Sequence, residues 1–193
     1  MHKTFYDRTE AERIALTERA IEQGASLLVR WSALAEPEAS SWNARASAAG
    51  EWLAGEAGVL DIGCGTMTLE GYLPGARYLP CDICARDPRT IVCDLNKDPV
   101  PVAPATAVAC LGLLEYVHDP RALMLSLGRI YPRAVVSYCT VDAPVPLLPR
   151  KAHGWVNDMT RSQVEALFLE TGWRVEEFKQ LDDVQGLWKL TTP

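Results

Sequence analysis

The sequence predicts an α/β fold, a doubly wound and mostly parallel seven-stranded sheet with an N-terminal helical extension. From residue 42 onward, short apolar segments alternate with amphipathic helical patterns, which is typical of a parallel sheet covered on both faces. The 193 residues, 48% of them hydrophobic and 23% charged, suffice for one domain with a single buried core. We therefore expect a single globular unit, with the extension over residues 1–41 and the main domain over residues 42–193.

The extension is predicted to begin with a helix. Thr9 followed by Glu12 forms the pattern of a capping box, and apolar residues recur every seven positions as far as Leu28. Gly24 weakens this pattern without forbidding a helix, so we expect the helix to continue past it. A second helix is predicted over residues 42–55.

Seven short segments then read as strands, and two helices are marked by their caps. Asp119 and Pro120 fit the N-cap and the first position of one helix. Thr160 and Gln163 form a capping box for the other, which we expect to end at Gly172. The predicted strands are residues 58–62, 77–82, 90–93, 105–111, 134–139, 173–178 and 186–190.

The segment VLDIGCGTM, residues 59–67, carries the strongest functional pattern. A buried strand delivers Asp61 and then two glycines into a tight turn, where a ligand can approach the backbone closely. Such turns at the carboxyl ends of central strands bind nucleotides. A dinucleotide fingerprint needs Gly or Ala where this chain has Thr68, which counts against a nicotinamide-dependent oxidoreductase.

With Asp61-Ile62-Gly63-Cys64-Gly65, the chain resembles the class I, Rossmann-like S-adenosylmethionine-dependent methyltransferases, in particular small type-11-like members. The resemblance covers about residues 42–190. It implies a methyltransferase that uses S-adenosyl-L-methionine. It also implies that Asp82 binds the ribose hydroxyls and that Asp94 accepts from the adenine amino group, with Leu95 beside the ring. The other implied cofactor-binding residues are Asp61, Gly63, Cys64, Gly65, Ile83, Leu111, Gly112 and Trp42.

Two departures from the family pattern concern the cofactor site. Only a short span containing Pro88 separates Asp82 from the third strand, where the family usually has a helix. Met67 replaces the third glycine of the motif. We expect a reduced but intact site whose adenosine end is more exposed than in most relatives.

The cysteines around Asp82 allow other interpretations. Cys81 and Cys84 form a Cys-x-x-Cys pair, and Cys93 follows, but a zinc site needs four ligands and no fourth stands at suitable spacing. A thioredoxin-like motif would open a helix after the first strand, not follow the second. We expect small buried thiols and no metal.

Catalytic candidates follow from the same resemblance, which places residues 142–158 over the substrate pocket. His153 in that segment is a candidate general base, although an exposed loop histidine is an equally good interpretation. His118, Tyr138 and Asp142 are further candidates. Glu115 and His118 stand just beyond the fourth strand, where the substrate cleft would begin.

Charge and hydropathy limit the kinds of binding partner to expect. A net charge of −6 with no long basic cluster counts against nucleic acid. There is no apolar run of membrane-spanning length and no secretory signal, so we expect a cytoplasmic protein with reduced thiols. The expected partner is a small-molecule methyl acceptor with an oxygen or nitrogen nucleophile, a sugar or another biosynthetic intermediate. A non-catalytic scaffold and an RNA or protein methyltransferase stay open as alternatives. The sequence indicates neither the acceptor nor the oligomeric state.

Overall fold

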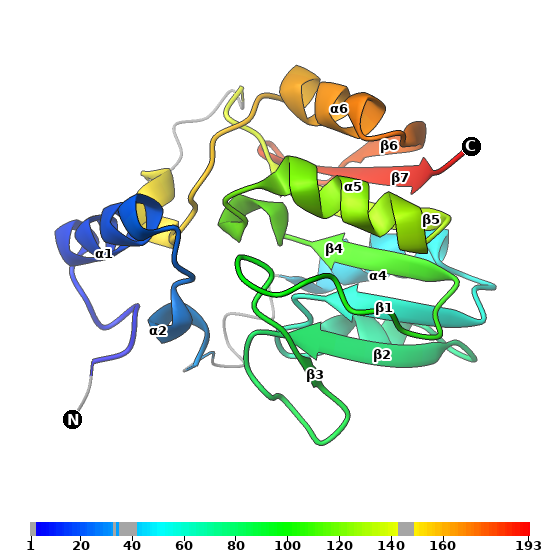
Figure 1. The fold of residues 1–193 in the computed structure, drawn as a ribbon, viewed down its shortest axis with the longest axis horizontal. Helices are drawn as coiled ribbons and strands as arrows, with labels where there is room; N and C mark the ends of the chain where they lie inside the picture. Colours follow the sequence, from blue (N-terminus) through cyan, green and yellow to red (C-terminus); the bar gives the residue numbers. More distant parts are fainter. Residues whose placement is uncertain (1–2, 33, 35–41, 143–148) are drawn as a thin grey trace.

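A seven-stranded sheet lies at the centre of the computed structural model, which describes residues 3–32, 34, 42–142 and 149–193 (Figure 1). The strand order is β3-β2-β1-β4-β5-β7-β6. Neighbouring strands from β3 to β5 are parallel, and β7 runs antiparallel to both β5 and β6. The predicted fold class is confirmed, with each strand within two residues of its expected bounds. The strands are β1 Gly58–Ile62, β2 Arg77–Asp82, β3 Ile91–Val92, β4 Ala107–Leu111, β5 Arg133–Cys139, β6 Arg174–Gln180 and β7 Gln185–Thr191.

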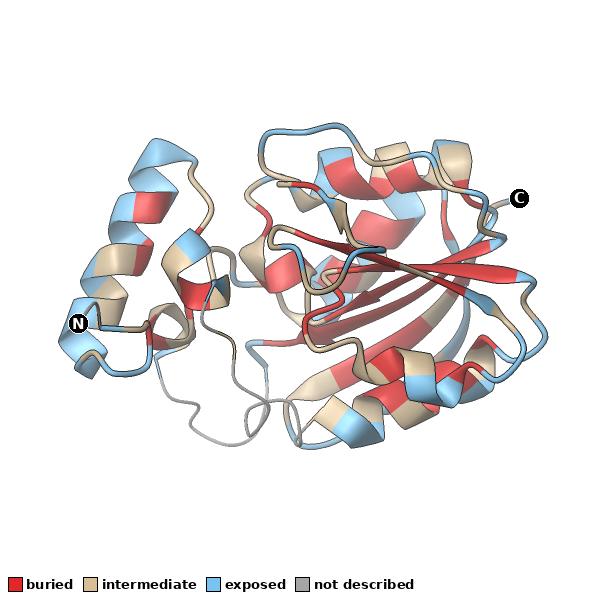
Figure 2. Ribbon diagram, turned by 90° about the horizontal axis from the view of Figure 1, so that it is seen from below, coloured by how far each residue is buried: buried red, intermediate tan, exposed pale blue. Residues whose placement is uncertain are grey.

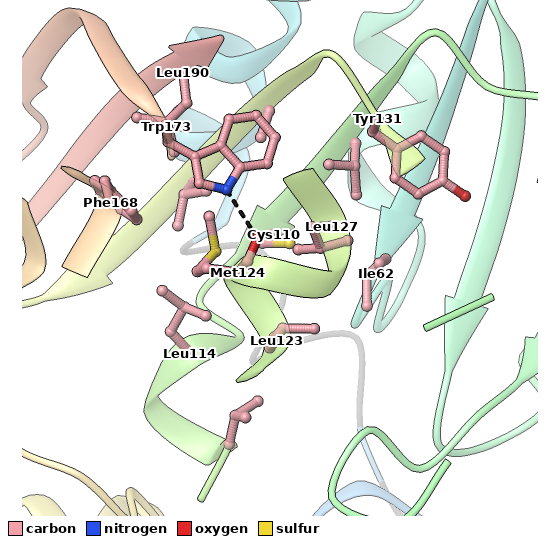
Figure 3. Packing of buried hydrophobic residues seen from close by; sticks show 14 of the residues in the cluster. Ile62, Cys110, Leu114, Leu123, Met124, Leu127, Tyr131, Phe168, Trp173 and Leu190 are labelled. Atoms are coloured by element: carbon pink, nitrogen blue, oxygen red, sulfur yellow. Dashed lines mark hydrogen bonds between the residues drawn. The ribbon is translucent and has the colours of Figure 1, made fainter. Parts of the chain in front are cut away.

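Alternation along the strands divides the core between the two faces of the sheet. Leu60 points to the face covered by α5 (Pro120–Ile130) and α6 (Arg161–Glu170), whereas Val59 points to α4 (Asn43–Trp52). On the first face the indole of Trp173 donates from Nε1 to the carbonyl of Met124 at 2.9 Å, among fully buried aliphatic side chains (Figure 3). The central strands β1, β4 and β5 are therefore buried on both faces, as their apolar runs predicted, whereas β6 at one edge of the sheet is largely exposed.

The helix caps show where sequence signals were read correctly and where they were not. Both capping boxes form, at Thr9 and at Thr160. The prediction that the first helix continues past Gly24 is wrong. α1 (Glu10–Gln23) ends there because Gly24 adopts a left-handed φ of 59° and its N–H closes the last turn. A separate short helix, α2 (Leu28–Trp31), follows.

The extension lies beyond the carboxyl ends of the parallel strands (Figures 1 and 2). Phe5, Ala20 and Leu27 form its small core. α1 also packs on the 3₁₀ helix η4 (Arg150–His153) from the second half of the chain, and the Thr17 hydroxyl donates to the carbonyl of Lys151 at 2.7 Å. Two distant parts of the sequence thus meet over the edge of the sheet where the glycine turn lies.

The connections between the strands near that edge are short. A 3₁₀ helix, η2 (Thr68–Tyr72), stands between β1 and β2. Residues 83–90 between β2 and β3 contain no helix, which confirms the short connection predicted there. No helix of the described residues is both long and apolar enough to cross a bilayer.

Candidate functional site

Backbone hydrogen bonds join the glycine turn after β1 to the end of β2. The backbone N–H groups of Gly63 and Cys64 both donate to the carbonyl of Cys81, at 2.8 and 3.0 Å. Gly63 has a φ of 74° and Gly65 a φ of 54°, left-handed conformations that favour glycine. Met67 has a φ of 58°, so this turn keeps a left-handed residue where the family glycine is replaced, at a cost of about 1–2 kcal/mol.

Asp61 lies beneath this turn. Its carboxylate is 3% exposed and accepts a hydrogen bond from the hydroxyl of Tyr78 at 2.7 Å. Burial raises the pKa of Asp61 to about 6, against the opposing effects of Tyr78 and Arg45. The carboxylate therefore joins the end of β1 to Tyr78 of β2.

Asp82 joins the end of β2 to the turn and to the shortened connection. Its Oδ2 accepts from the N–H of Gly65, and its Oδ1 accepts from the N–H of Cys84 and from Nη2 of Arg86, each at 2.9 Å. Arg86 also donates from Nη1 to the carbonyl of Trp31 in α2 at 3.0 Å. The sequence did not reveal Arg86, because nothing local indicates an arginine that links the cofactor side to the extension.

Asp94 is held by the loop between α1 and α2. The Ser26 hydroxyl donates to its Oδ1 at 2.5 Å, and Lys97 lies 3.2 Å from its Oδ2. Asn96 donates to the Ser26 oxygen at 2.8 Å. Although the helix after β2 is missing as predicted, the extension forms a wall here. That the adenosine end is more exposed than in most relatives stays a prediction.

Between these elements lies a largely apolar pocket that opens to the surface. One wall comes from the extension and the other from the ends of the strands. Its lining includes Ala25, Ser26, Leu27, Trp31, Gly63, Asp82, Ile83, Asp94, Leu95, Gly112 and Leu113.

A second, more polar pocket shares Gly63 and Gly112 with the first. Trp42 packs on the glycine turn, since a Cβ at Gly65 would lie 3.1 Å from its ring. Leu111 lines this pocket and also a small cleft beside it, with Asp61 and Cys64. The predicted cofactor residues therefore line three adjoining cavities; their binding roles stay predictions.

Arg45 of α4 supplies a cation to the polar pocket. Its guanidinium lies over the Trp42 ring, 5.4 Å from the centroid, and its buried Nε has no hydrogen-bond partner among the described residues. A Cβ at Gly112 would lie 2.6 Å from Nη1 of Arg45, and Gly112 has a φ of 68°. The left-handed backbone favours glycine here, and a larger residue would displace the end of the arginine side chain. Burial lowers the pKa of Arg45, and Glu115 opposes that effect.

Glu115 is a buried acid that lines this pocket. It lies in the 3₁₀ helix η3 (Leu114–Tyr116) and is 1% exposed. Its Oε1 accepts from the N–H of Cys139 at 2.9 Å, whereas its buried Oε2 has no partner in the described part of the chain. Burial raises the pKa of Glu115. The sequence put Glu115 at the start of the cleft but gave no sign of the unpartnered oxygen.

Of the four catalytic candidates, the structure brings His153 into the polar pocket. Its half-buried ring stacks on Trp155 with centroids 5.0 Å apart, and burial lowers its pKa. His118 lines a different cleft, and its Nε2 is 3.0 Å from the carbonyl of Ala25.

The other two candidates do not line the polar pocket. Tyr138 is fully buried and donates to the side chain of Asn157 at 2.7 Å. Asp142 is exposed and accepts from the N–H of Arg161 at the start of α6. Residues 143–148 of the predicted pocket loop lie outside the described residues.

The six cysteines are free thiols. Cys81 and Cys93 lie side by side. The hydrogen bond between them, together with burial, raises the pKa of Cys81, and the same hydrogen bond lowers the pKa of Cys93 against the effect of burial. The described residues contain no group of three or more His, Cys, Asp or Glu side chains placed to hold a metal ion.

Comparisons with known proteins agree with this geometry. The profile of a family described as a methyltransferase domain matches residues 34–177. No curated protein matches the chain in sequence.

Solved structures share the fold at low identity. Human N-acetylserotonin methyltransferase in complex with SAM has a TM-score of 0.61 and 18% identity, over 96% of this chain and 57% of that one. The mitomycin 7-O-methyltransferase has a TM-score of 0.69 and 15% identity, over 98% of this chain and 70% of that one. A Synechocystis magnesium protoporphyrin IX methyltransferase with bound SAH has a TM-score of 0.60 and 12% identity, over 80% of this chain and 84% of that one. The chain thus spans little more than half of the human enzyme.

Proposed function

This chain belongs to the methyltransferase-domain family, with the class I S-adenosylmethionine-dependent fold, and we propose that it methylates a small-molecule acceptor. The observation that carries the proposal is the junction of two pockets at Gly63 and Gly112. One pocket has the acids and apolar walls that a nucleoside needs, and the other has buried charged groups suited to polar ligands.

The residues present fit S-adenosylmethionine. Asp82 and Asp94 line the adenosine side with Ile83 and Leu95, and a carboxylate can accept both hydroxyls of a ribose. Arg45 would hold the carboxylate of the methionine end. When bound, the cofactor supplies an electrophilic methyl group on a sulfonium. The chain's contribution is then to orient the acceptor and exclude water, which can supply about 7–11 kcal/mol.

The polar pocket supports a small acceptor with an oxygen or nitrogen nucleophile. The mitomycin and calicheamicin enzymes among the similar structures are named for small-molecule chemistry. The net charge of −6 disfavours RNA. His153 would be one source of a base in this pocket. Free thiols support a cytoplasmic location as part of the same proposal.

Calorimetry with S-adenosylhomocysteine tests the cofactor half of the proposal. We expect the wild-type protein to bind it and Asp82→Ala to bind at least about tenfold more weakly, since charge-assisted hydrogen bonds are lost. Glu51→Gln changes an exposed acid on α4 and is the matched control, with affinity unchanged. Absence of binding by the wild type, or equal binding by Asp82→Ala, would refute this role.

The alternative of a non-catalytic member is supported by one contact. Arg86 donates to Oδ1 of Asp82, one of the two carboxylate oxygens to which a ribose hydroxyl could donate. Such a protein would bind S-adenosylhomocysteine but produce none from S-adenosylmethionine with any acceptor, and turnover measurements separate the two functions.

A further inference from the structure

We propose that Glu115 is the catalytic base of the polar pocket and that the acceptor is a hydroxylated aromatic ring whose hydroxyl donates to Oε2 of Glu115. This inference rests on the proposed methyl transfer. It names the residue that receives the proton and the chemical class of the acceptor.

The first argument is the unpartnered oxygen. The N–H of Cys139 donates to Oε1 of Glu115, while Oε2 has no donor among the residues that the structure describes. Leaving a buried carboxylate oxygen unsatisfied is unfavourable, so its persistence needs an explanation. A donor from a bound ligand provides one.

The second argument is the position of Glu115. It follows Gly112 by three residues, and both line the polar pocket, while Gly112 also lines the adenosine pocket. Arg45 lines the same region from α4. A hydroxyl on Oε2 would therefore lie on the side of the pocket where the proposed methyl donor ends.

The third argument concerns the walls, which are aromatic. Trp31 and Tyr116 meet edge to face with centroids 4.7 Å apart, and His153 stacks on Trp155 at 5.0 Å. Tyr6 completes the set, with the Arg30 guanidinium 4.4 Å from its centroid. Rings arranged in this way favour a flat aromatic guest, which stacks on their faces or edges.

The groups that act on the charge of Glu115 come from several elements. Burial disfavours its carboxylate form, whereas Arg45 from α4 and Arg150 from η4 favour it. A base is most effective when its pKa lies close to the working pH, and burial raises the pKa of Glu115 in that direction.

The proposed step balances. The acceptor O–H bond breaks as its proton passes to Oε2, and the oxygen forms a bond to the methyl carbon. The bond from that carbon to sulfur breaks, its electron pair stays on sulfur, and S-adenosylhomocysteine is left. Glu115 then releases the proton to solvent.

Paired acceptors test this role. Each hydroxybenzoate in a small panel is compared with its mercaptobenzoate analogue, because a thiol is much more acidic and ionises without a base. S-adenosylhomocysteine production is measured for the wild type and for Glu115→Gln, whose amide oxygen can still accept from Cys139. We expect the variant to lose roughly 10²–10⁴-fold in kcat/KM for the phenols and less than tenfold for the thiols.

The control is Glu51→Gln, which should leave both rates unchanged, and S-adenosylhomocysteine binding by Glu115→Gln checks its fold. Equal losses for phenol and thiol would assign Glu115 a structural role and overturn the inference. Loss of the phenol reaction in His153→Gln but not in Glu115→Gln would also overturn it, as would binding of S-adenosylhomocysteine with no phenol turnover by the wild type. Failure of the wild type to bind S-adenosylhomocysteine would instead refute the proposed function.

Should Glu115→Gln not fold, the wild-type pH profile decides. We expect phenol turnover to fall relative to thiol turnover as a carboxyl becomes protonated at lower pH. A constant ratio would overturn the inference.

Discussion

Asp61 shows how a single buried acid couples the glycine turn to pH. Its pKa is about 6 in the folded protein, against an ordinary value of 3.8, because burial penalises the charged form. An acid whose pKa is raised by folding stabilises the fold while it is protonated, and this contribution is lost as the pH rises through the folded pKa. The free energy of unfolding should therefore fall between about pH 4 and pH 6.

Asp61→Asn should remove this dependence. The amide oxygen can still accept from Tyr78, but it has no charge to bury. We expect the variant to match the wild type near pH 4 and to be more stable at pH 7 by up to about 3 kcal/mol, two pKa units at 1.36 kcal/mol each. Urea unfolding at both pH values measures the difference. A variant that is less stable than the wild type at pH 7 would show that the ionised carboxylate is stabilised after all.

At the scale of elements, the loop between α1 and α2 carries the part of the site that the sequence concealed. Ser26 donates to Asp94 and receives from Asn96, so two hydrogen bonds join the extension to the adenosine pocket. The loop exists because Gly24 ends α1. A glycine in a helical pattern predicts either a tolerated defect or a C-terminal cap, and only the backbone angle decides between them.

Ser26→Ala should loosen this wall. We expect S-adenosylhomocysteine binding to weaken a few-fold, and hydrogen exchange in residues 25–32 to increase, because about two hydrogen bonds of roughly 1 kcal/mol each are lost. Ser126→Ala, which removes an exposed hydroxyl from α5, should change neither. If Ser26→Ala exchanges and binds like the wild type, the extension is not a functional wall of the pocket.

At the scale of the whole molecule, the strands and the glycine turn were predictable because their signals are local. Apolar runs mark buried strands, and Asp61 with two glycines marks the turn. The pairing of Asp82 with Arg86 and of Thr17 with Lys151 was not predictable, because neither contact has a local pattern. The same holds for the free oxygen of Glu115, which depends on β5 lying beside η3. The sequence therefore predicts which residues line the cofactor side better than it predicts how the extension closes that side.

The structure of a complex with S-adenosylhomocysteine tests the central claim most directly. We expect the ribose at Asp82, the adenine between Ile83 and Leu95 near Asp94, and the carboxylate of the homocysteine end at Arg45. A complex with the ligand outside these pockets, or with Arg86 still closing Asp82 and the ribose elsewhere, would contradict the assignment of this site.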